Sequence, residues 1–88
     1  MNTNKKVSLE LYYFESCPYC QRVLGCLEEL NKKNEVTFID IKKDPQAKEK
    51  LFQETGRYTV PCLYIEGRPM HESLEIVRWL KTHFSNGV

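Results

Sequence analysis

The segment from Val7 to Tyr13 constrains the fold most, because every second residue in it is apolar and a helical pattern follows it closely. Alternation with a period of two predicts a β-strand with one buried face. From Pro18 to about Lys33, aliphatic residues recur at helical spacing, and proline suits the first position of a helix. The β-branched segment from Val36 to Ile41 predicts the next strand. Two strands joined through a helix in this way are expected to run parallel, with a right-handed crossover.

A second helix is predicted from Pro45 to about Thr55, since Asp44 fits its N-cap and Gly56 fits its C-terminal end. In the first helix, Gly25 is expected to allow close packing against the sheet, and Asn34 is expected to end the helix. The residues of the second helix that we expect to face inward are Ala47, Leu51 and Phe52.

Two further strands and a third helix are predicted in the C-terminal part of the chain. Strands from Val60 to Ile65 and from Arg68 to His71 flank the turn at Glu66-Gly67 and so form an antiparallel hairpin. The last helix is expected to run from Glu72 or Ser73 to Phe84. The order β-α-β-α-β-β-α predicts an α/β fold with a four-stranded mixed sheet flanked by three helices, which is the thioredoxin-like architecture. Residues 1–88 are expected to form a single domain.

The composition is that of an ordinary soluble domain. Hydrophobic residues make up 41% of the chain and charged residues 28%, and the net charge is +1. These values give no indication of a surface for nucleic acid or for a membrane. Residues 1–6 are polar, and no apolar segment of the signal-peptide type follows them. We therefore expect a monomeric cytoplasmic protein.

The motif Cys17-Pro18-Tyr19-Cys20 stands where the first strand gives way to the first helix. Cys17 is expected at the N-cap and Cys20 one turn later on the same helix face, so that the two sulfurs can form a disulfide. Unpaired backbone N–H groups at the helix start stabilise a thiolate at Cys17, whereas Cys20 lies deeper and stays a thiol. Cys17 is thus the expected nucleophile and Cys20 the resolving cysteine of thiol–disulfide exchange. A structural or metal-binding cysteine pair is the alternative interpretation.

Two further segments are candidates for binding a ligand beside the cysteines. Pro61 stands at the head of a strand, where a cis bond would bring the Val60 backbone next to the motif; a trans proline at a strand edge fits the residues equally well. A free N–H and C=O at Val60 would pair with an extended, peptide-like ligand. Glu72 and Ser73 begin the last helix, where Ser73 suits a carboxylate and Glu72 an amine, or where the two form a plain helix cap.

In combination, these features resemble the dithiol glutaredoxins over essentially the whole chain. The matching features are the strand that ends at Phe14, the motif Cys17–Cys20, the segment Gly56–Pro61 and the hairpin turn at Gly67. The resemblance implies a thioredoxin fold with a cis Pro61. It also implies a role in cell redox homeostasis, by glutathione-dependent reduction of protein disulfides and of glutathionylated proteins. Glutathione is the implied co-substrate, and no metal is expected.

The resemblance also assigns roles to single residues. It implies that Tyr19 flanks the glutathione sulfur, that Arg57 faces the glycine carboxylate, and that Val60 pairs with the cysteinyl backbone, with Thr59 and Pro61 beside it.

The chain departs from the glutaredoxin pattern in two places. Phe14 and Glu15 stand where many glutaredoxins have a lysine, so part of the positive clamp on the glycine carboxylate is missing. The segment Met70–Ile76 contains Glu72-Ser73 and is similar to the Glu-Ser-x-x-Ile element of glutathione-transferase N-terminal domains, which serves the γ-glutamyl end of glutathione.

Two other functions stay open. One is a dimeric carrier that holds a 2Fe–2S cluster through Cys17 and glutathione, although Pro18 disfavours this form in the family. The other is a disulfide reductase that is recycled by thioredoxin reductase, which the weakened clamp would permit. Cys26 and Cys62 are expected to be small buried hydrophobes or, alternatively, regulatory thiols.

Overall fold

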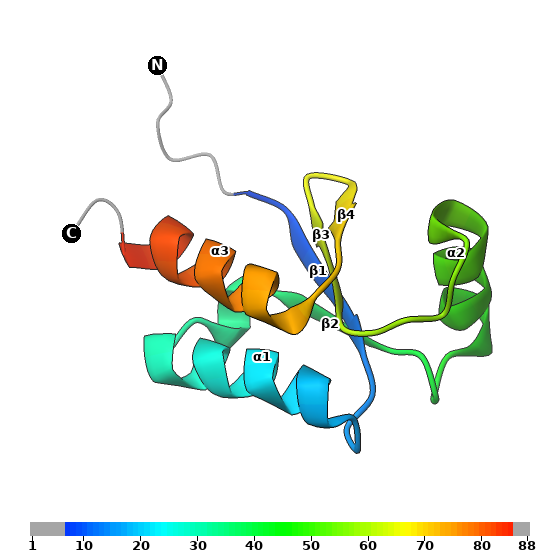
Figure 1. The fold of residues 1–88 in the computed structure, drawn as a ribbon, viewed down its shortest axis with the longest axis horizontal. Coiled ribbons are helices and arrows are strands. Elements are labelled where there is room, and N and C mark those ends of the chain that lie inside the picture. Colours follow the sequence, from blue (N-terminus) through cyan, green and yellow to red (C-terminus); the bar gives the residue numbers. More distant parts are fainter. Residues whose placement is uncertain (1–6, 86–88) are drawn as a thin grey trace.

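The computed structural model describes residues 7–85, which form a central sheet with helices on both faces (Figure 1). The elements in chain order are β1 (Leu9–Tyr13), α1 (Pro18–Leu30), a short 3-10 helix η1 (Lys33–Glu35), β2 (Thr37–Asp40), α2 (Pro45–Thr55), β3 (Cys62–Ile65), β4 (Arg68–Met70) and α3 (Ser73–Ser85). The predicted succession of strands and helices is confirmed. The strands are shorter than predicted, because each predicted range includes residues at its ends that belong to the connecting segments.

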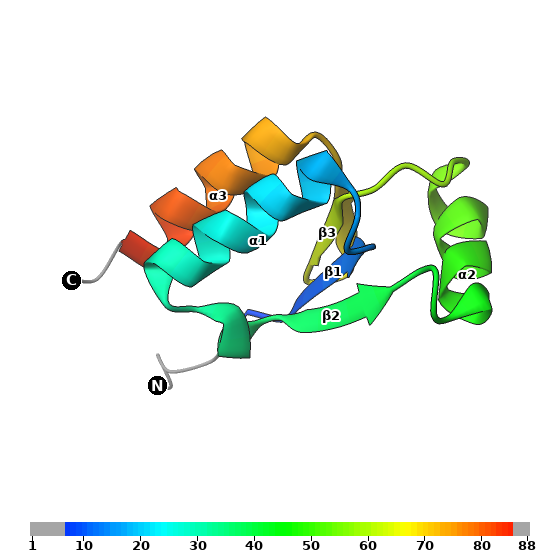
Figure 2. The same ribbon diagram turned by 90° about the horizontal axis from the view of Figure 1, so that it is seen from below.

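The sheet has the strand order β2-β1-β3-β4. β1 pairs in parallel with β2 and antiparallel with β3, while β3 and β4 form an antiparallel hairpin. Figures 1 and 2 show α1 and α3 side by side on one face of this sheet and α2 on the other face. The mixed four-stranded sheet and the thioredoxin-like arrangement are therefore confirmed.

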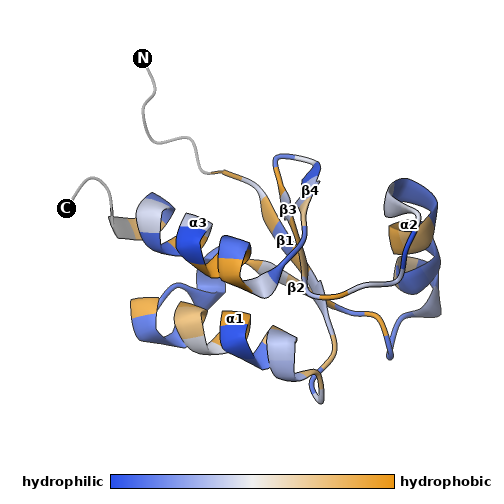
Figure 3. Cartoon of the chain, viewed as in Figure 1, coloured by the Kyte–Doolittle hydropathy of each residue, from blue (hydrophilic) through white to orange (hydrophobic). Residues whose placement is uncertain are grey.

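Each face of the sheet carries its own apolar core, because successive side chains of a strand point to opposite faces. The buried residues under α1 and α3 are Leu9, Leu11, Val23, Cys26, Leu27, Val36, Leu63, Ile76 and Leu80. The buried residues under α2 are Tyr12, Ile41, Ala47, Leu51, Cys62 and Tyr64. Figure 3 shows hydrophobic and hydrophilic residues alternating along α1 and α3, as expected for helices with one buried side.

The first helix is shorter than predicted. α1 ends at Leu30, and the following residue, Asn31, adopts a left-handed conformation with φ of 59°. The backbone N–H of Asn31 donates to the carbonyl oxygen of Glu28 at 3.0 Å, which closes the last turn. Asparagine tolerates this conformation better than most residues with a side chain. The prediction that Asn34 ends the helix is therefore wrong, because the left-handed turn at Asn31 has already ended it.

The second helix begins and ends where the sequence predicts. The Asp44 carboxylate accepts hydrogen bonds from the backbone N–H groups of Gln46 and Ala47, at 3.1 and 3.2 Å. Gly56 follows the helix in a left-handed conformation with φ of 81°, and its N–H donates to the carbonyl oxygen of Phe52. Both caps satisfy backbone groups that a helix end leaves unpaired.

Two predictions about single residues are wrong. Phe52 does not face inward with Ala47 and Leu51: its side chain is 40% exposed and its ring stacks on that of Tyr58, with 4.6 Å between the centroids. Gly25 does not mark a close approach to the sheet. A Cβ atom built on Gly25 would meet nothing within 4 Å, so the glycine faces open space.

Candidate active site

The nucleophile expected from the sequence lies at the start of α1. Cys17 is the N-cap residue, with extended backbone, and Pro18 occupies the first helical turn. The backbone N–H of Cys20 donates to Cys17 Sγ at 3.3 Å. The first turn of α1 carries no acidic residue that would oppose a negative charge on this sulfur. The helix start therefore gives this sulfur a backbone N–H donor and no acidic neighbour in the same turn.

The two cysteines of the motif differ in their surroundings. Cys17 is 6% exposed and Cys20 is completely buried. Burial, together with the hydrogen bond to Cys17, raises the pKa of Cys20 to about 12. Cys20 is therefore a neutral thiol at physiological pH, in agreement with the expectation that it lies deeper than Cys17.

The segment that precedes β3, the neighbour of β1 in the sheet, approaches the same sulfur. The bond between Val60 and Pro61 is cis, as the family resemblance implied. The carbonyl oxygen of Val60 lies 3.9 Å from Cys17 Sγ, at hydrogen-bond distance for a thiol. Two segments that are 43 residues apart in the sequence thus meet at Cys17.

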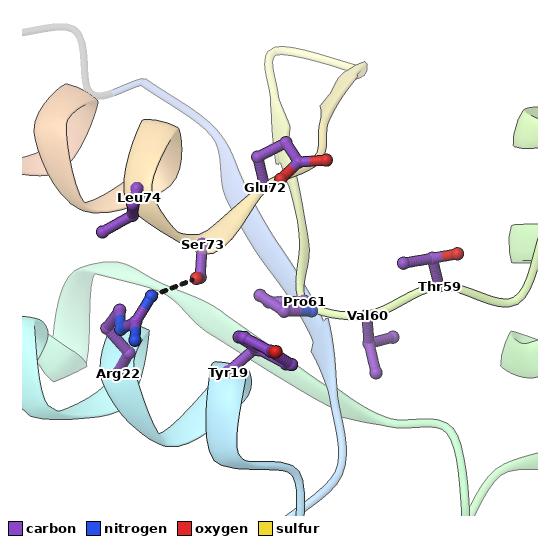
Figure 4. Close-up of a pocket in the computed structure, with 8 residues that line it drawn as sticks. All are labelled: Tyr19, Arg22, Thr59, Val60, Pro61, Glu72, Ser73 and Leu74. Atoms are coloured by element: carbon purple, nitrogen blue, oxygen red, sulfur yellow. Dashed lines mark hydrogen bonds between the residues drawn. The ribbon is translucent and has the colours of Figure 1, made fainter.

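A pocket of about 330 Å³ opens next to this meeting point. The residues that line it come from α1, from the segment before β3 and from the start of α3 (Figure 4): Tyr19, Arg22, Thr59, Val60, Pro61, Glu72, Ser73 and Leu74. All the residues proposed from the sequence as glutathione contacts are in this set except Arg57. Cys17 does not line the pocket itself but adjoins it through Val60.

The start of α3 presents a strained residue and a buried hydroxyl to the pocket. Glu72 has a left-handed backbone with φ of 76°, an uncommon conformation for a residue with a side chain that concentrates at functional sites. Ser73 is only 6% exposed. Its Oγ accepts a hydrogen bond from Nη1 of Arg22 at 3.2 Å, so the hydroxyl is tied to α1 and not to the backbone of its own helix.

Arg22 and Leu74 line the pocket although the sequence interpretation did not select them. Arg22 lies three residues after Tyr19 on α1, and its guanidinium carbon is 5.8 Å from the centre of the Tyr19 ring. The spacing of three residues on a predicted helix was the signal that would have placed Arg22 beside Tyr19. Arg57, by contrast, is exposed and lies outside the pocket lining. Burial lowers the pKa of His71, and the positive charge of Arg57 lowers it further.

The two remaining cysteines are buried in the two cores. Cys26 is 5% exposed and Cys62 is completely buried. Burial raises the pKa of Cys26, and it raises that of Cys62 to about 11. Cys62 Sγ lies 3.9 Å from Nε2 of His71. This environment fits the interpretation of both cysteines as small core residues.

The sequence profile described as "Glutathione S-transferase, N-terminal domain" matches residues 16–83, which include the cysteine motif and nearly all of the pocket-forming elements. The chain belongs to this family. Glutaredoxin 3 of Escherichia coli is also similar, with 32% identity over 63 residues that cover 69% of this chain and 71% of that protein. The expected likeness to glutaredoxins, with a transferase-like element at Glu72-Ser73, is therefore confirmed.

Other relatives are longer than this chain. Protein IN2-1 homolog A of rice is 34% identical over 77 residues, which cover 84% of this chain and 30% of that protein. Among solved structures, glutathione transferase Omega 3C from Trametes versicolor has a TM-score of 0.74 and 28% identity, covering 92% of this chain and 35% of its own. Isozyme E7 of the Drosophila melanogaster glutathione S-transferase has a TM-score of 0.73 at 22% identity, and the match covers 90% of this chain and 36% of that protein. This chain thus spans about a third of each of these three proteins.

The comparisons place the chain among glutathione-related proteins with the thioredoxin-like fold. Within residues 7–85, no helix is both long enough and apolar enough to cross a membrane.

Proposed function

We propose that this protein is a glutathione-dependent thiol–disulfide oxidoreductase of the glutaredoxin type. The observation that carries the proposal is the position of Cys17 Sγ, at the N-terminus of α1 and 3.9 Å from the Val60 carbonyl oxygen at the edge of the pocket. A nucleophilic sulfur beside the Val60 peptide unit suits a peptide that itself contains the reacting sulfur. Glutathione is such a peptide.

In the proposed complex, glutathione lies across the end of α1 with its sulfur at Cys17. Val60 pairs with the backbone of its cysteine, with Thr59 and Pro61 beside it, while Tyr19 covers the sulfur. Tyr19 is 60% exposed, so its ring is free to pack against a ligand.

The two ends of glutathione are held by different elements in this proposal. The γ-glutamyl group meets Glu72 and Ser73, and the glycine carboxylate extends toward Arg57. The completely buried Cys20 does not touch the ligand and acts only on a sulfur bound to Cys17.

The reduction of a glutathionylated substrate takes two exchange steps. The Cys17 thiolate attacks the glutathione sulfur of the mixed disulfide; the old S–S bond breaks, and the substrate sulfur leaves as a thiolate that takes a proton from water. A second glutathione, as its thiolate, then attacks the glutathione sulfur on Cys17. Glutathione disulfide leaves, and the Cys17 thiolate is restored. The net reaction consumes one reduced glutathione, and the glutathione carried by the substrate becomes the other half of the glutathione disulfide.

A protein disulfide requires Cys20 in addition. After Cys17 has formed a mixed disulfide with the substrate, the Cys20 sulfur loses its proton and attacks Cys17 Sγ, which releases the second substrate thiolate. The resulting Cys17–Cys20 disulfide is reduced by two glutathione molecules. In the reduced protein burial raises the pKa of Cys20 to about 12, so Cys20 is held as a neutral thiol before Cys17 forms the mixed disulfide.

The physiological partners that we propose are glutathione and proteins carrying disulfides or glutathione adducts. We place this activity in the cytoplasm, where glutathione keeps thiols reduced, and we propose that the monomer carries it out.

The test is turnover of a mixed disulfide between glutathione and a small thiol, coupled to glutathione reductase and NADPH. Cys17→Ser is expected to abolish turnover, because Cys17 supplies the attacking sulfur beside Val60 while Cys20 and Cys62 are completely buried; Cys20→Ser should keep it. Cys26→Ala, in the same helix but under α3, is the matched control and should turn over normally. Full activity of Cys17→Ser would refute the mechanism. A wild-type protein reduced by thioredoxin reductase but not by glutathione would show a different electron donor.

A further inference from the structure

The Arg22 guanidinium is a charged group of the pocket that the exchange chemistry does not use. It projects from α1 toward the start of α3, where its Nη1 donates to Ser73 Oγ at 3.2 Å (Figure 4). Its guanidinium carbon also lies 5.8 Å from the centre of the Tyr19 ring. Arg22 therefore connects two walls of the pocket that are 51 residues apart in the sequence.

The charge of Arg22 is not neutralised within the described part of the chain. No carboxylate of residues 7–85 lies within ion-pair distance of its guanidinium. Among the residues that line the pocket, Arg22 is the cation and Glu72 is the anion. A guanidinium has five N–H donors, and Ser73 accepts from one of them, so others are available to a ligand. The pocket thus contains one free charge of each sign.

The hydrogen bond from Arg22 also determines how the Ser73 hydroxyl can bind a ligand. Because Ser73 Oγ accepts from Arg22, the hydroxyl proton is left to donate to an acceptor on the ligand. Figure 4 shows the side chains of Arg22 and Glu72 on opposite sides of Ser73. A ligand group with a carboxylate near Arg22 and an ammonium near Glu72 matches this arrangement. An α-amino acid terminus has both groups on one carbon atom.

We infer that Arg22 determines specificity for a free α-carboxylate on the ligand, by direct hydrogen bonding and through the hydroxyl of Ser73. The inference rests on the proposed function, in which the γ-glutamyl end of glutathione occupies this part of the pocket. Arg22 is thus a positive charge at the γ-glutamyl end of the ligand, whereas the lysine that is absent before the cysteine motif would serve the glycine end. A peptide without the α-carboxylate gains nothing from the guanidinium.

The test is a binding cycle between Arg22 and the carboxylate, measured by calorimetry. The two probes are S-methylglutathione, which has no free thiol, and the same peptide with a γ-aminobutyryl group in place of γ-glutamyl, which lacks only the α-carboxylate. For the wild type, loss of the carboxylate is expected to raise Kd about tenfold. Arg22→Gln should raise Kd for S-methylglutathione about tenfold and leave Kd for the shortened peptide unchanged.

Two variants control for charge and for fold. Arg78→Gln removes the same charge from the exposed surface of α3, outside the pocket lining, and should bind both peptides as the wild type does. Arg22→Lys keeps a point charge without the planar fork and should recover S-methylglutathione binding to within about threefold of the wild type. Circular dichroism melts of all variants check that the fold is intact.

The outcomes separate the inference from the function on which it rests. If Arg22→Gln raises Kd for both peptides by the same factor, the arginine only holds the pocket walls together and the inference fails. If Arg22→Gln binds S-methylglutathione as tightly as the wild type, the inference fails while glutathione binding stands. If the wild type binds neither peptide, the proposed function itself is wrong, and the inference falls with it.

Discussion

Replacing Gly25 with alanine is expected to stabilise the protein, although this glycine lies in the helix that begins at the cysteine motif. Gly25 sits in the middle of α1, where glycine is less favourable than alanine by about 1 kcal/mol. A Cβ atom there would meet nothing within 4 Å, so no repulsion offsets the gain. Gly25 borders a surface hollow between α1 and α3, whose lining includes Arg22 and Val77, and the methyl group would extend into that space.

The expected gain is thus about 1 kcal/mol in the free energy of unfolding, which for a domain of this size raises Tm by about 4–8 °C. Urea denaturation followed by circular dichroism measures the gain, with wild type and variant fitted to a common m-value. The glutathione turnover that we propose should be unchanged, because Gly25 does not line the pocket beside Cys17.

Gly56→Ala is the matched control for this argument. Gly56 ends α2 with φ of 81°, a conformation that costs a residue with a Cβ atom about 1–2 kcal/mol, although open space also surrounds it. The same substitution is therefore expected to destabilise the protein at Gly56 and to stabilise it at Gly25. A loss of stability in Gly25→Ala, or equal effects at both positions, would refute the reasoning that backbone conformation decides the sign.

Three further predictions concern caps, packing and thiol reactivity. Asp44→Ala removes the acceptor of two backbone N–H groups and should lower the free energy of unfolding in urea by about 1 kcal/mol, whereas Asp44→Asn should lose less. Leu51→Ala, at a completely buried position, should lower the free energy of unfolding by about 2–5 kcal/mol, whereas Phe52→Ser should lower it by less than about 1 kcal/mol. Equal losses would place Phe52 in the core. Iodoacetamide at pH 8 should modify Cys17 and spare Cys20, as measured by peptide mass spectrometry. The pKa of Cys20, raised to about 12, keeps its thiol protonated at every pH well below that value. An adduct on Cys20 in the folded protein would contradict this prediction.

The parts of the fold that local signals determine were predictable. Asp44 and Gly56 act on backbone groups within four residues of themselves, so their identities alone locate the two ends of α2. The position of Cys17 at the N-cap follows in the same way from Pro18, which fits only the first turn of a helix.

The features that depend on tertiary neighbours could not be predicted. The role of Arg22 requires α3 to arrive beside α1, and nothing in the residues around Arg22 encodes the position of Ser73. The exposure of Phe52 depends on how far α2 extends over the sheet, and helical spacing alone does not give this distance. Asn31 and Asn34 are equally plausible as helix ends by residue type, and only the closing hydrogen bond to Glu28 decides between them.

The contact between Cys17 and Val60 has a consequence for where reactivity resides. Cys17 is the N-cap of α1 on one face of the sheet, whereas Val60 packs against the core under α2 on the other face. The pairing of β1 with β3 holds the two residues next to each other. A fragment that contained the cysteine motif and α1 would have both sulfurs but no opposing peptide edge. Partial unfolding that separates β3 from β1 would remove the Val60 carbonyl from Cys17 while the motif stayed at the start of α1. The selectivity for glutathione that we propose is thus expected to depend on the assembled sheet and not on the four-residue motif alone.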